Sequence, residues 1–380
     1  MRIAVTSPPW IPLPPYGYGG IERVVTNLTE GLVKKGHQVT LFATGDSQTS
    51  AKLEYLYHHA LGNHLDLKLN PYFIVDHIYH FYKNTNHKFD IIHDNSSELA
   101  LYFADMVTTP TVTTLHGTYI DGTKDLLDKY RFMNTIKKTL TEFKHKPFVS
   151  ISDTQRKGLP DLNYIKTIYN SIILHEFDFN QLGGKNMVWM GRINYTKGVD
   201  LGIEAAEKTK HKLVLASYLD HGDIPYYKTE IESHFANKIV SNIGEMKNKK
   251  TKSKFLGNAK LFLFPIRWDE PFGIVMIEAM ATGTPVIAYA LGSVPEVIKD
   301  GQTGFIVNAS SDDIRGNWIV KKTGVQGLCE AVERIYSLPQ DKYLEMRKAC
   351  RSHVEKHFTV DTMVDKYIKV FEEVISKHKK

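Results

Sequence analysis

The sequence predicts an α/β protein of two domains, each built on a parallel sheet covered by helices. Short apolar runs typical of buried strands alternate along the chain with longer segments whose apolar residues recur at helical spacing. This alternation indicates parallel sheets, because the crossover between neighbouring parallel strands is usually a helix. The chain has 380 residues, which is long for one hydrophobic core, so two domains are expected. We place them at residues 1–180 and 181–360 and expect a helix over 361–380.

Composition and charge exclude several classes of protein. Hydrophobic residues make up 42% and charged residues 24% of the chain, and no apolar run approaches the ~20 residues of a membrane span. The net charge of +6 at pH 7 is modest, so we expect no nucleic-acid partner and leave a peripheral contact with an anionic membrane open. Cys329 and Cys350 lack metal-ligand spacing and are expected to be free thiols in a reducing cytoplasm.

The first domain opens with a strand at residues 2–7 and a Pro-rich loop. The glycines around Gly19 and Gly20 follow, and an amphipathic helix then runs to Gly36. A strand, a Gly-rich loop and a helix form the arrangement that holds nucleotide phosphates. The third glycine of the dinucleotide-binding motif is missing, so these residues alone are equally compatible with a flexible turn.

A histidine follows one of the later strands of this domain. Further strands are predicted at residues 37–43, 90–93, 111–115 and 148–152. Residues 50–88 show no clear motif and are expected to contain helices. The strand at 111–115 leads into His116, and ligands of parallel sheets bind at the carboxyl ends of strands. A single histidine is more often structural, so the pattern leaves both roles open for His116; His93 and Asp94 form a further candidate pair.

The second domain carries two cations in the loop after its first strand. Its strands are predicted at residues 187–190, 212–217, 238–242, 261–264 and 286–289, with a last strand after Gly301. Arg192 as a planar fork and Lys197 as a point charge could both hold a diphosphate, and ordinary surface cations are the alternative. The Lys-rich stretch at 247–254 is interpreted as a solvated face, with contact to an anionic ligand or lipid left open.

The most informative stretch is a loop and a short helix between two buried strands in the second half of the chain. The backbone N–H groups of Phe272, Gly273 and Ile274 lie at the predicted helix N-terminus, which is a favourable place for a phosphate. Glu270 and Glu278 frame this place, and a carboxylate can accept from both hydroxyls of a vicinal diol. The alternative makes Glu270 a first-turn acid and Glu278 a solvated residue.

Glu270-Pro-Phe-Gly, with seven residues between Glu270 and Glu278, resembles the signature of the retaining GT-B glycosyltransferases of family GT4. Other segments resemble the same family: Gly-Gly-Ile-Glu-Arg-Val-Val from Gly19, Leu-His-Gly at 115–117, Gly-Arg-x4-Lys-Gly at 191–198, and Asn170-Ser171, where Asn-Gly is usual. The resemblance covers nearly the whole chain and is weakest over residues 50–88 and 119–147.

The resemblance implies a GT-B fold, in which two Rossmann-like domains have parallel sheets facing across a cleft and the final helix packs back on the first domain. It implies retaining transfer of a hexose from a UDP- or GDP-sugar donor to a hydroxyl of a glycan, lipid-linked or small-molecule acceptor. It implicates two sets of residues: catalytic Glu270, Arg192, Lys197 and His116, and donor-binding Gly19, Gly20, Phe272, Gly273, Ile274 and Glu278.

The chain contains no Asp-x-Asp, so we predict neither a metal ion nor any cofactor beyond the nucleotide-sugar co-substrate. Two alternatives remain. A GT-B sugar-nucleotide 2-epimerase would need an acid–base pair at the hexose C2, which the sequence does not place. A non-catalytic sugar-nucleotide or glycan-binding protein would not need the two cations and two glutamates to occur together.

Overall fold

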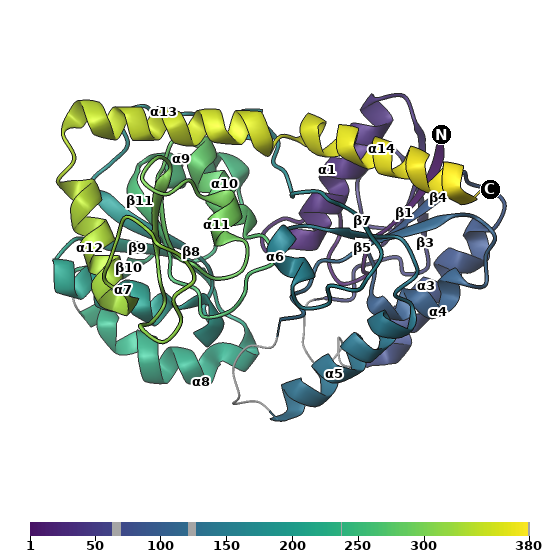
Figure 1. The fold of residues 1–380 in the computed structure, drawn as a ribbon, viewed down its shortest axis with the longest axis horizontal. Coiled ribbons are helices and arrows are strands. Elements are labelled where there is room, and N and C mark those ends of the chain that lie inside the picture. Colours follow the sequence, from purple (N-terminus) through teal and green to yellow (C-terminus); the bar gives the residue numbers. More distant parts are fainter. Residues whose placement is uncertain (63–69, 121–126, 237, 379–380) are drawn as a thin grey trace. The chain divides into compact units, whose positions relative to one another are not determined.

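A computed structural model describes residues 1–62, 70–120, 127–236 and 238–378 of the chain (Figure 1). The chain forms two compact units: unit 1 contains Met1–Ser171 and Val360–Lys380, and unit 2 contains Ile172–Thr359. The division therefore lies earlier than the boundary predicted at residue 180. Ser171 still bonds within unit 1, because its carbonyl accepts from Asn27 Nδ2 at 3.2 Å and its hydroxyl donates to Met363 Sδ at 3.3 Å.

Unit 1 is built on a seven-stranded sheet. The strands are β1 (Arg2–Thr6), β2 (Gln38–Ala43), β3 (Lys52–Tyr55), β4 (Ile91–Asp94), β5 (Thr111–Thr114), β6 (Phe148–Ser150) and β7 (Tyr164–Thr167). The helices are α1 (Gly20–Lys34), α3 (Pro71–Thr85), α4 (Leu101–Ala104), α5 (Leu127–Glu142), α6 (Asp153–Arg156) and α14 (Val360–His378), with a one-turn helix η1 (Glu98–Ala100). All paired strands are parallel, in the order β3-β2-β1-β4-β5-β6-β7. The 50–88 region, where helices were expected, contains helix α3 and also strand β3.

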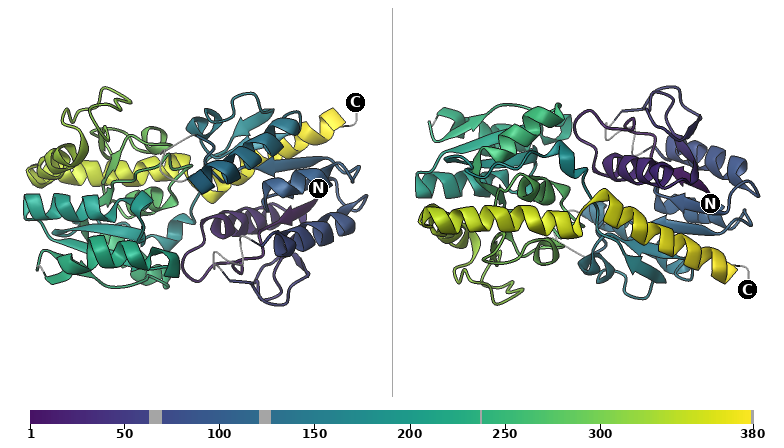
Figure 2. Two further views of the ribbon diagram at one scale, coloured as in Figure 1. Left: turned by 90° about the horizontal axis from the view of Figure 1, so that it is seen from below. Right: turned by 90° about the horizontal axis from the view of Figure 1, so that it is seen from above.

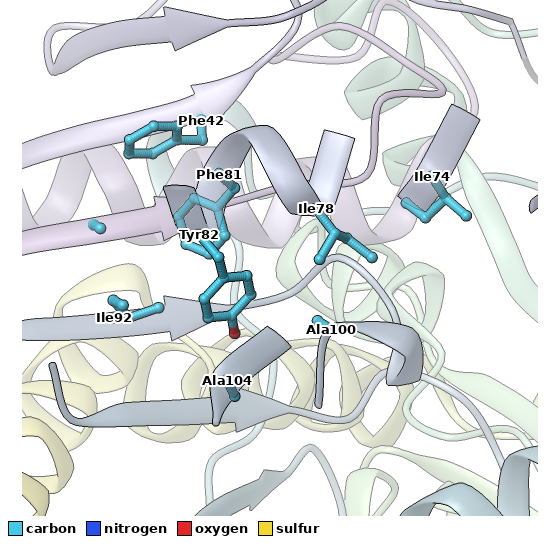
Figure 3. Packing of buried hydrophobic residues seen from close by; sticks show 9 residues of the cluster. Phe42, Ile74, Ile78, Phe81, Tyr82, Ile92, Ala100 and Ala104 are labelled. Atoms are coloured by element: carbon cyan, nitrogen blue, oxygen red, sulfur yellow. The ribbon is translucent and has the colours of Figure 1, made fainter. Parts of the chain in front are cut away.

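Helix α3 packs on the central strands of this sheet through a buried apolar cluster (Figure 3). The cluster contains Ala4, Phe42, Ile74, Ile78, Phe81, Tyr82, Ile92, Ala100 and Ala104. Ile74, Ile78 and Phe81 recur at spacings of three and four residues, so they share one face of α3. Phe81 meets Phe42 of β2 edge-on, with ring centroids 4.8 Å apart. This packing holds β1, β2 and β4 in place and thereby positions the sheet edge at which they end.

The C-terminal helix α14 belongs to unit 1 and packs on α1 (Figures 1 and 2). Its buried face is the one that helical spacing predicts: Met363, Val364, Tyr367, Val370, Phe371 and Val374. Tyr367 reaches the sheet, where its hydroxyl lies 3.0 Å from Thr114 Oγ1 of β5. The last helix of the chain therefore supports the strand that leads to His116.

Unit 2 is built on a six-stranded parallel sheet. Its strands are β8 (Asn186–Arg192), β9 (Leu213–Tyr218), β10 (Val240–Asn242), β11 (Ala259–Phe264), β12 (Val286–Tyr289) and β13 (Gly304–Val307), in the order β10-β9-β8-β11-β12-β13. Its helices are α7 (Val199–Thr209), α8 (Ile224–Tyr226), α9 (Lys249–Gly257), α10 (Ile274–Ala281), α11 (Val294–Val297), α12 (Gly324–Tyr336) and α13 (Gln340–His357). Short helical turns are η2 (Leu174–Glu176), η3 (Tyr195–Lys197), η4 (His221–Asp223), η5 (Tyr227–Ile231) and η6 (Glu232–Ala236). The predicted α/β class with two Rossmann-like sheets is confirmed.

Each sheet has a point at which the direction of the strand order reverses. In unit 1 the chain runs outward from β1 to β2 and β3 and returns to β4 on the other side of β1. In unit 2 it runs outward from β8 to β9 and β10 and returns to β11 beside β8. Ligands of open parallel sheets bind beside such reversals, at the carboxyl ends of the strands. The loops after β1, β4, β8 and β11 are therefore the first places to look for a site.

Membrane spans, disulfides and metal clusters were not expected from the sequence. Among the described residues, no helix is long and apolar enough to cross a membrane. Cys329 and Cys350 are both free thiols, and burial raises the pKa of the Cys350 thiol to about 12. The part of the chain that the structure describes contains no group of three or more His, Cys, Asp or Glu side chains placed to hold a metal ion.

Candidate functional site

The loop after β8 brings Arg192 and Lys197 to the carboxyl edge of the unit 2 sheet. Strand β8 ends at Arg192, and Asn194 closes the turn of η3 by accepting at Oδ1 from the backbone N–H of Lys197 at 3.1 Å. Gly198 then leads into α7 with φ of 64°, and a Cβ there would lie 1.8 Å from the carbonyl oxygen of Pro265. Only glycine fits this contact, which holds the β8 loop against the loop after β11.

Glu270 lies in the loop after β11 and pairs with Lys197. Its Oε2 lies 2.5 Å from Lys197 Nζ and accepts from Trp268 Nε1 at 2.9 Å. The Lys197 ammonium also lies 4.7 Å from the centroid of the Trp268 ring, a cation–π contact. The Glu270 and Lys197 side chains are 12% and 21% exposed, so the pair is shielded but still accessible. The fold thus brings two predicted catalytic residues from separate loops into direct contact.

The segment after β12 holds the backbone around Glu270. The backbone N–H of Ser293 donates to the Glu270 carbonyl at 2.9 Å, and the Ser293 hydroxyl donates to the Phe272 carbonyl at 2.8 Å. The backbone N–H of Gly292 donates to Asp269 Oδ1 at 2.8 Å. These bonds fix the main chain on both sides of Glu270, so a buried scaffold sets the direction of its carboxylate.

Helix α10 begins directly after this loop. Gly273 is the N-cap residue with φ of 74°, which strongly favours glycine, and it has no side chain with which to cap the first turn from Ile274. Backbone N–H groups at such an end carry a partial positive charge and bind anions. The Phe272 side chain is buried and meets Phe358 edge-on with ring centroids 5.8 Å apart, so any role of Phe272 in binding a ligand is confined to its main chain.

Glu278 lies on α10 and forms an ion pair with Lys252 of α9. The Glu278 side chain is 3% exposed, and its Oε1 lies 2.5 Å from Lys252 Nζ. The prediction that the stretch 247–254 is a solvated face is wrong for Lys252, whose side chain is 12% exposed. Lys252 lies four residues before the buried Leu256, so it shares the inner face of α9. A carboxylate paired through one oxygen can still accept hydroxyl groups.

Acidic side chains after β9 engage Arg192. Its Nε lies 2.5 Å from Asp223 Oδ2, and its Nη1 lies 4.0 Å from Asp220 Oδ2. A guanidinium has five N–H donors in a planar fork, so one group can serve more than one anion. No motif in the sequence pointed to these two aspartates, which orient Arg192 at the end of β8.

The glycine loop of unit 1 leads into α1. Gly19 is buried and precedes the helix, whereas Gly20 is exposed and begins it. Arg23 closes the loop by donating from Nη2 to the carbonyl of Gly17 at 3.1 Å. The N-cap residue, Gly19, has no side chain with which to cap this helix N-terminus, as is usual where a helix end holds a phosphate, and the acidic Glu22 lies in the first turn.

His116 follows β5, and Asn95 in the loop after β4 holds its ring. The Nε2 of His116 lies 2.9 Å from Asn95 Oδ1. Gln155 of α6 fixes the main chain on both sides by donating from Nε2 to the carbonyls of Leu115 at 2.9 Å and Gly117 at 2.6 Å. Burial lowers the pKa of His116 to about 4, so the ring is neutral near pH 7.

Besides Asp220 and Asp223, the sequence patterns did not point to Lys252, Asn95 and Trp268, which contact predicted site residues. The position of Asn95 could have indicated its role. Asn95 follows β4 as His116 follows β5, and these two strands are paired, so the two residues lie at the same edge of the sheet. Helical spacing within the Lys-rich stretch could have separated Lys252 from its exposed neighbours. No pattern in the sequence ties the Trp268 indole to a carboxylate two residues away.

Two protein-family models match the chain. The model described as Glycosyl transferases group 1 matches residues 175–317, and the model described as Glycosyltransferase Family 4 matches residues 18–172. The first range contains the charged loops of unit 2, and the second contains the glycine loop and His116.

Curated relatives and solved structures are similar to this chain over different lengths. An uncharacterized glycosyltransferase of Methanocaldococcus jannaschii is 25% identical over 350 residues, which cover 82% of this chain and 86% of that protein. Alpha-maltose-1-phosphate synthase of Mycobacterium tuberculosis is 30% identical over 192 residues, 48% of this chain and 47% of the synthase. Several curated relatives are thus matched over only about half of their length. The crystal structure of HepE from Anabaena in complex with UDP and glucose has a TM-score of 0.72 at 15% identity, covering 98% of this chain and 100% of that one.

The family matches and the fold support one assignment. Together the two family models span most of both units, and the solved neighbour shares the architecture of two Rossmann-like sheets. The chain belongs to the group 1, family 4 glycosyltransferases, which have the GT-B fold.

Proposed function

We propose that this protein is a retaining glycosyltransferase that moves a hexose from a nucleoside-diphosphate sugar to a hydroxyl acceptor. The observation that carries the proposal is the contact between Lys197 and Glu270 beside the uncapped N-terminus of α10. A cation and a helix N-terminus suit a diphosphate, whereas a carboxylate suits the hydroxyls of a sugar. The protein needs neither a metal ion nor a further cofactor in this proposal.

The reaction breaks the bond between the anomeric carbon and the diphosphate. Negative charge grows on the leaving diphosphate, and Arg192, Lys197 and the backbone N–H groups around Gly273 stabilise it; loss of one such preorganised donor typically costs roughly 3–4 kcal/mol of barrier. Positive charge develops on the sugar, and Glu270 stabilises it while binding sugar hydroxyls. The acceptor proton passes to the leaving phosphate, so we assign no protein base.

The nucleotide part of the donor is proposed to bind through Glu278. Its carboxylate accepts from the two ribose hydroxyls, and Lys252 balances its charge in a buried position. UDP is the first nucleotide to test, because the solved neighbour HepE binds UDP together with glucose. GDP is the second. The acceptor is a hydroxyl group of a glycan, a lipid-linked glycan or a small molecule.

Hydrolysis of candidate donors, followed by NMR, tests this function against its alternatives. Without an acceptor, a retaining enzyme slowly releases a hexose whose first-formed anomer is that of the donor, and this is visible before mutarotation. A 2-epimerase gives the C2 epimer, and a binding protein gives no turnover. Release of the opposite anomer first would overturn retention. The Glu270→Gln variant, purified in the same way, controls for contaminating hydrolases.

A further inference from the structure

A continuous path of hydrogen-bonding side chains runs from α14 to His116 within unit 1. The Tyr367 hydroxyl lies 3.0 Å from Thr114 Oγ1, which lies 2.7 Å from His93 Nε2. On the other side of the His93 ring, Nδ1 lies 3.4 Å from Asn95 Nδ2. The other amide atom, Asn95 Oδ1, lies 2.9 Å from His116 Nε2. The path joins β4, β5 and α14 and ends at the ring predicted to meet the donor sugar.

The amide of Asn95 gives this path a direction. Its Oδ1 can only accept a hydrogen bond, and its Nδ2 can only donate one. His116 must therefore carry a proton on Nε2, whereas His93 must present a bare Nδ1 to the amide. The proton of a neutral His93 is then on Nε2, from which it donates to Thr114 Oγ1. The Thr114 hydroxyl is left to donate to the Tyr367 oxygen.

Burial keeps both rings neutral, so each carries a single N–H. Burial lowers the pKa of His93 to about 3 and that of His116 to about 4. His93 has no exposed surface, and its ring centroid lies 5.0 Å from that of Tyr367 and 5.4 Å from that of Phe371. In a neutral imidazole, a proton on one nitrogen leaves the other as an acceptor.

The loop that carries Asn95 is itself held firmly. Asp94 accepts at Oδ1 from the backbone N–H and the hydroxyl of Ser96, at 2.8 and 2.6 Å, and at Oδ2 from the Tyr82 hydroxyl at 2.7 Å. Asn95 is only 4% exposed. The amide is therefore presented in a fixed orientation to both histidines.

We propose that Asn95 and His93 are positioning residues that fix His116 as the Nε2–H tautomer, so that its Nδ1 accepts a hydrogen bond from a hydroxyl of the donor sugar. Among the described residues, no side chain or backbone group is hydrogen-bonded to Nδ1 of His116. A bare nitrogen at this position selects a hydroxyl, which can donate, over a phosphate or carbonyl oxygen, which cannot. The inference rests on the proposed function only for the identity of the ligand.

The tautomers can be read directly by NMR on the full chain with 15N-labelled histidine. Long-range 1H–15N correlations at mildly alkaline pH separate protonated from bare ring nitrogens. The variants His116→Gln and His93→Gln identify the signals of the two rings, because each variant lacks the signals of the ring that it replaces. We expect protonated Nε2 and bare Nδ1 in both rings. Protonated Nδ1 in His116 would overturn the proposal, because Asn95 would then have to present its N–H₂ group to that ring.

Substitutions of Asn95 test whether this residue sets the tautomer. Asn95→Asp keeps the acceptor for His116 but removes the donor to His93, so His93 should switch to Nδ1–H while His116 stays Nε2–H. Asn95→Leu removes both contacts and should give a mixture of tautomers at His116. An unchanged His116 in Asn95→Leu would overturn the role of Asn95. The control is the variant Asn86→Asp in the same unit. Asn86 Oδ1 accepts hydrogen bonds from Thr108, and a carboxylate can accept the same bonds. This variant should therefore leave the tautomers of both histidine rings unchanged.

Titration with the donor tests the ligand half of the inference. On binding, the bare Nδ1 of His116 should shift toward the position of a hydrogen-bonded acceptor while Nε2 stays protonated. A donor that binds and turns over without moving this signal would overturn the assigned contact and leave the transferase function standing. If both rings show the expected tautomers but the protein shows no turnover, the positioning role of Asn95 and His93 would stand and the result would count against the proposed function.

Discussion

The two units present different kinds of polar group at their candidate sites. Unit 2 presents ion pairs, in which Lys197 meets Glu270 and Lys252 meets Glu278. Unit 1 presents neutral groups, a glycine loop before α1 and a histidine ring held by Asn95. The difference has a physical origin: burial removes the charge of histidine rings, whereas a buried lysine and carboxylate compensate each other.

This contrast indicates a division of labour in the proposed reaction. The charges that change during transfer are on the diphosphate and the anomeric carbon, and the charged groups of unit 2 suit them. A hydroxyl of the sugar stays uncharged throughout the reaction, and a neutral hydrogen-bond acceptor such as His116 suits it. Substitutions in unit 2 should therefore affect the chemical step most, and the following experiments test that expectation.

Glu270→Gln should have the largest effect. The positive charge that develops on the sugar strengthens the contact with Glu270 in the transition state, so kcat should fall by ~10²-fold or more. Some increase in the donor KM is expected as well, because Glu270 is also proposed to bind hydroxyls in the ground state. Steady-state kinetics at saturating donor measure the change. The matched control is Glu345→Gln, which removes an exposed pair with Lys342 and should leave kcat unchanged.

Glu278→Gln should act mainly on donor affinity. The ribose does not change during transfer, so the donor KM should rise roughly tenfold, as expected for loss of a hydrogen bond to a charged group, while kcat is kept. The double variant Glu278→Gln/Lys252→Met controls for the lysine left without its partner. Kinetics together with donor calorimetry decide the outcome. If Glu278→Gln lowers kcat while Glu270→Gln lowers only the donor affinity, the roles assigned to Glu270 and Glu278 are reversed.

Acid should destabilise unit 1 more than unit 2. Burial lowers the pKa of His77 to about 4 and that of His93 to about 3, both from 6.5. The unfolded chain therefore binds more protons below pH 6.5, and the free energy of unfolding falls as the pH drops toward 4, by up to about 1.4 kcal/mol per pH unit for each group. Hydrogen exchange measured by mass spectrometry at about pH 7 and about pH 5 resolves the two units. An equal or larger loss in unit 2 would contradict this expectation.

Chelation should have the smallest effect. We expect activity to survive excess EDTA, because Lys197 and Arg192 supply the positive charge that a metal ion would otherwise bring to the diphosphate. The assay compares initial rates before and after chelation, with added Mg²⁺ or Mn²⁺ as the reference condition. A complete loss of activity that Mg²⁺ or Mn²⁺ restores would show that the positive charge of Lys197 and Arg192 is not sufficient for the reaction.

Much of the fold was predictable because its strands are short, buried apolar runs. Strands β1, β2, β8, β11 and β12 are of this kind. Strand β3 was missed because its residues, Lys52–Tyr55, lie at the sheet edge and are only partly buried, so they show no apolar run. The apolar face of α14 was predictable because it follows helical spacing without interruption.

Contacts within the candidate site were predictable only between residues that lie in one segment of the sequence. Glu270, Glu278 and the N-terminus of α10 follow each other closely in the sequence. Lys197 was recognisable as a cation, but its contact with Glu270 depends on the pairing of β8 with β11. The partners Lys252 and Asn95 come from other loops, and only the three-dimensional packing shows what they contact.

The most direct test of the account compares a nucleoside diphosphate with its monophosphate. Calorimetry should use the nucleoside of the best donor, with the wild type, Lys197→Met and Glu278→Gln. We expect the diphosphate to bind at least about tenfold more tightly, since a charge-assisted contact to phosphate is worth that much. Lys197→Met should abolish most of this advantage, whereas Glu278→Gln should weaken both ligands alike. Equal affinity for the two nucleotides in the wild type, or an advantage that Lys197→Met leaves unchanged, would contradict the claim that the charged site of unit 2 holds the diphosphate.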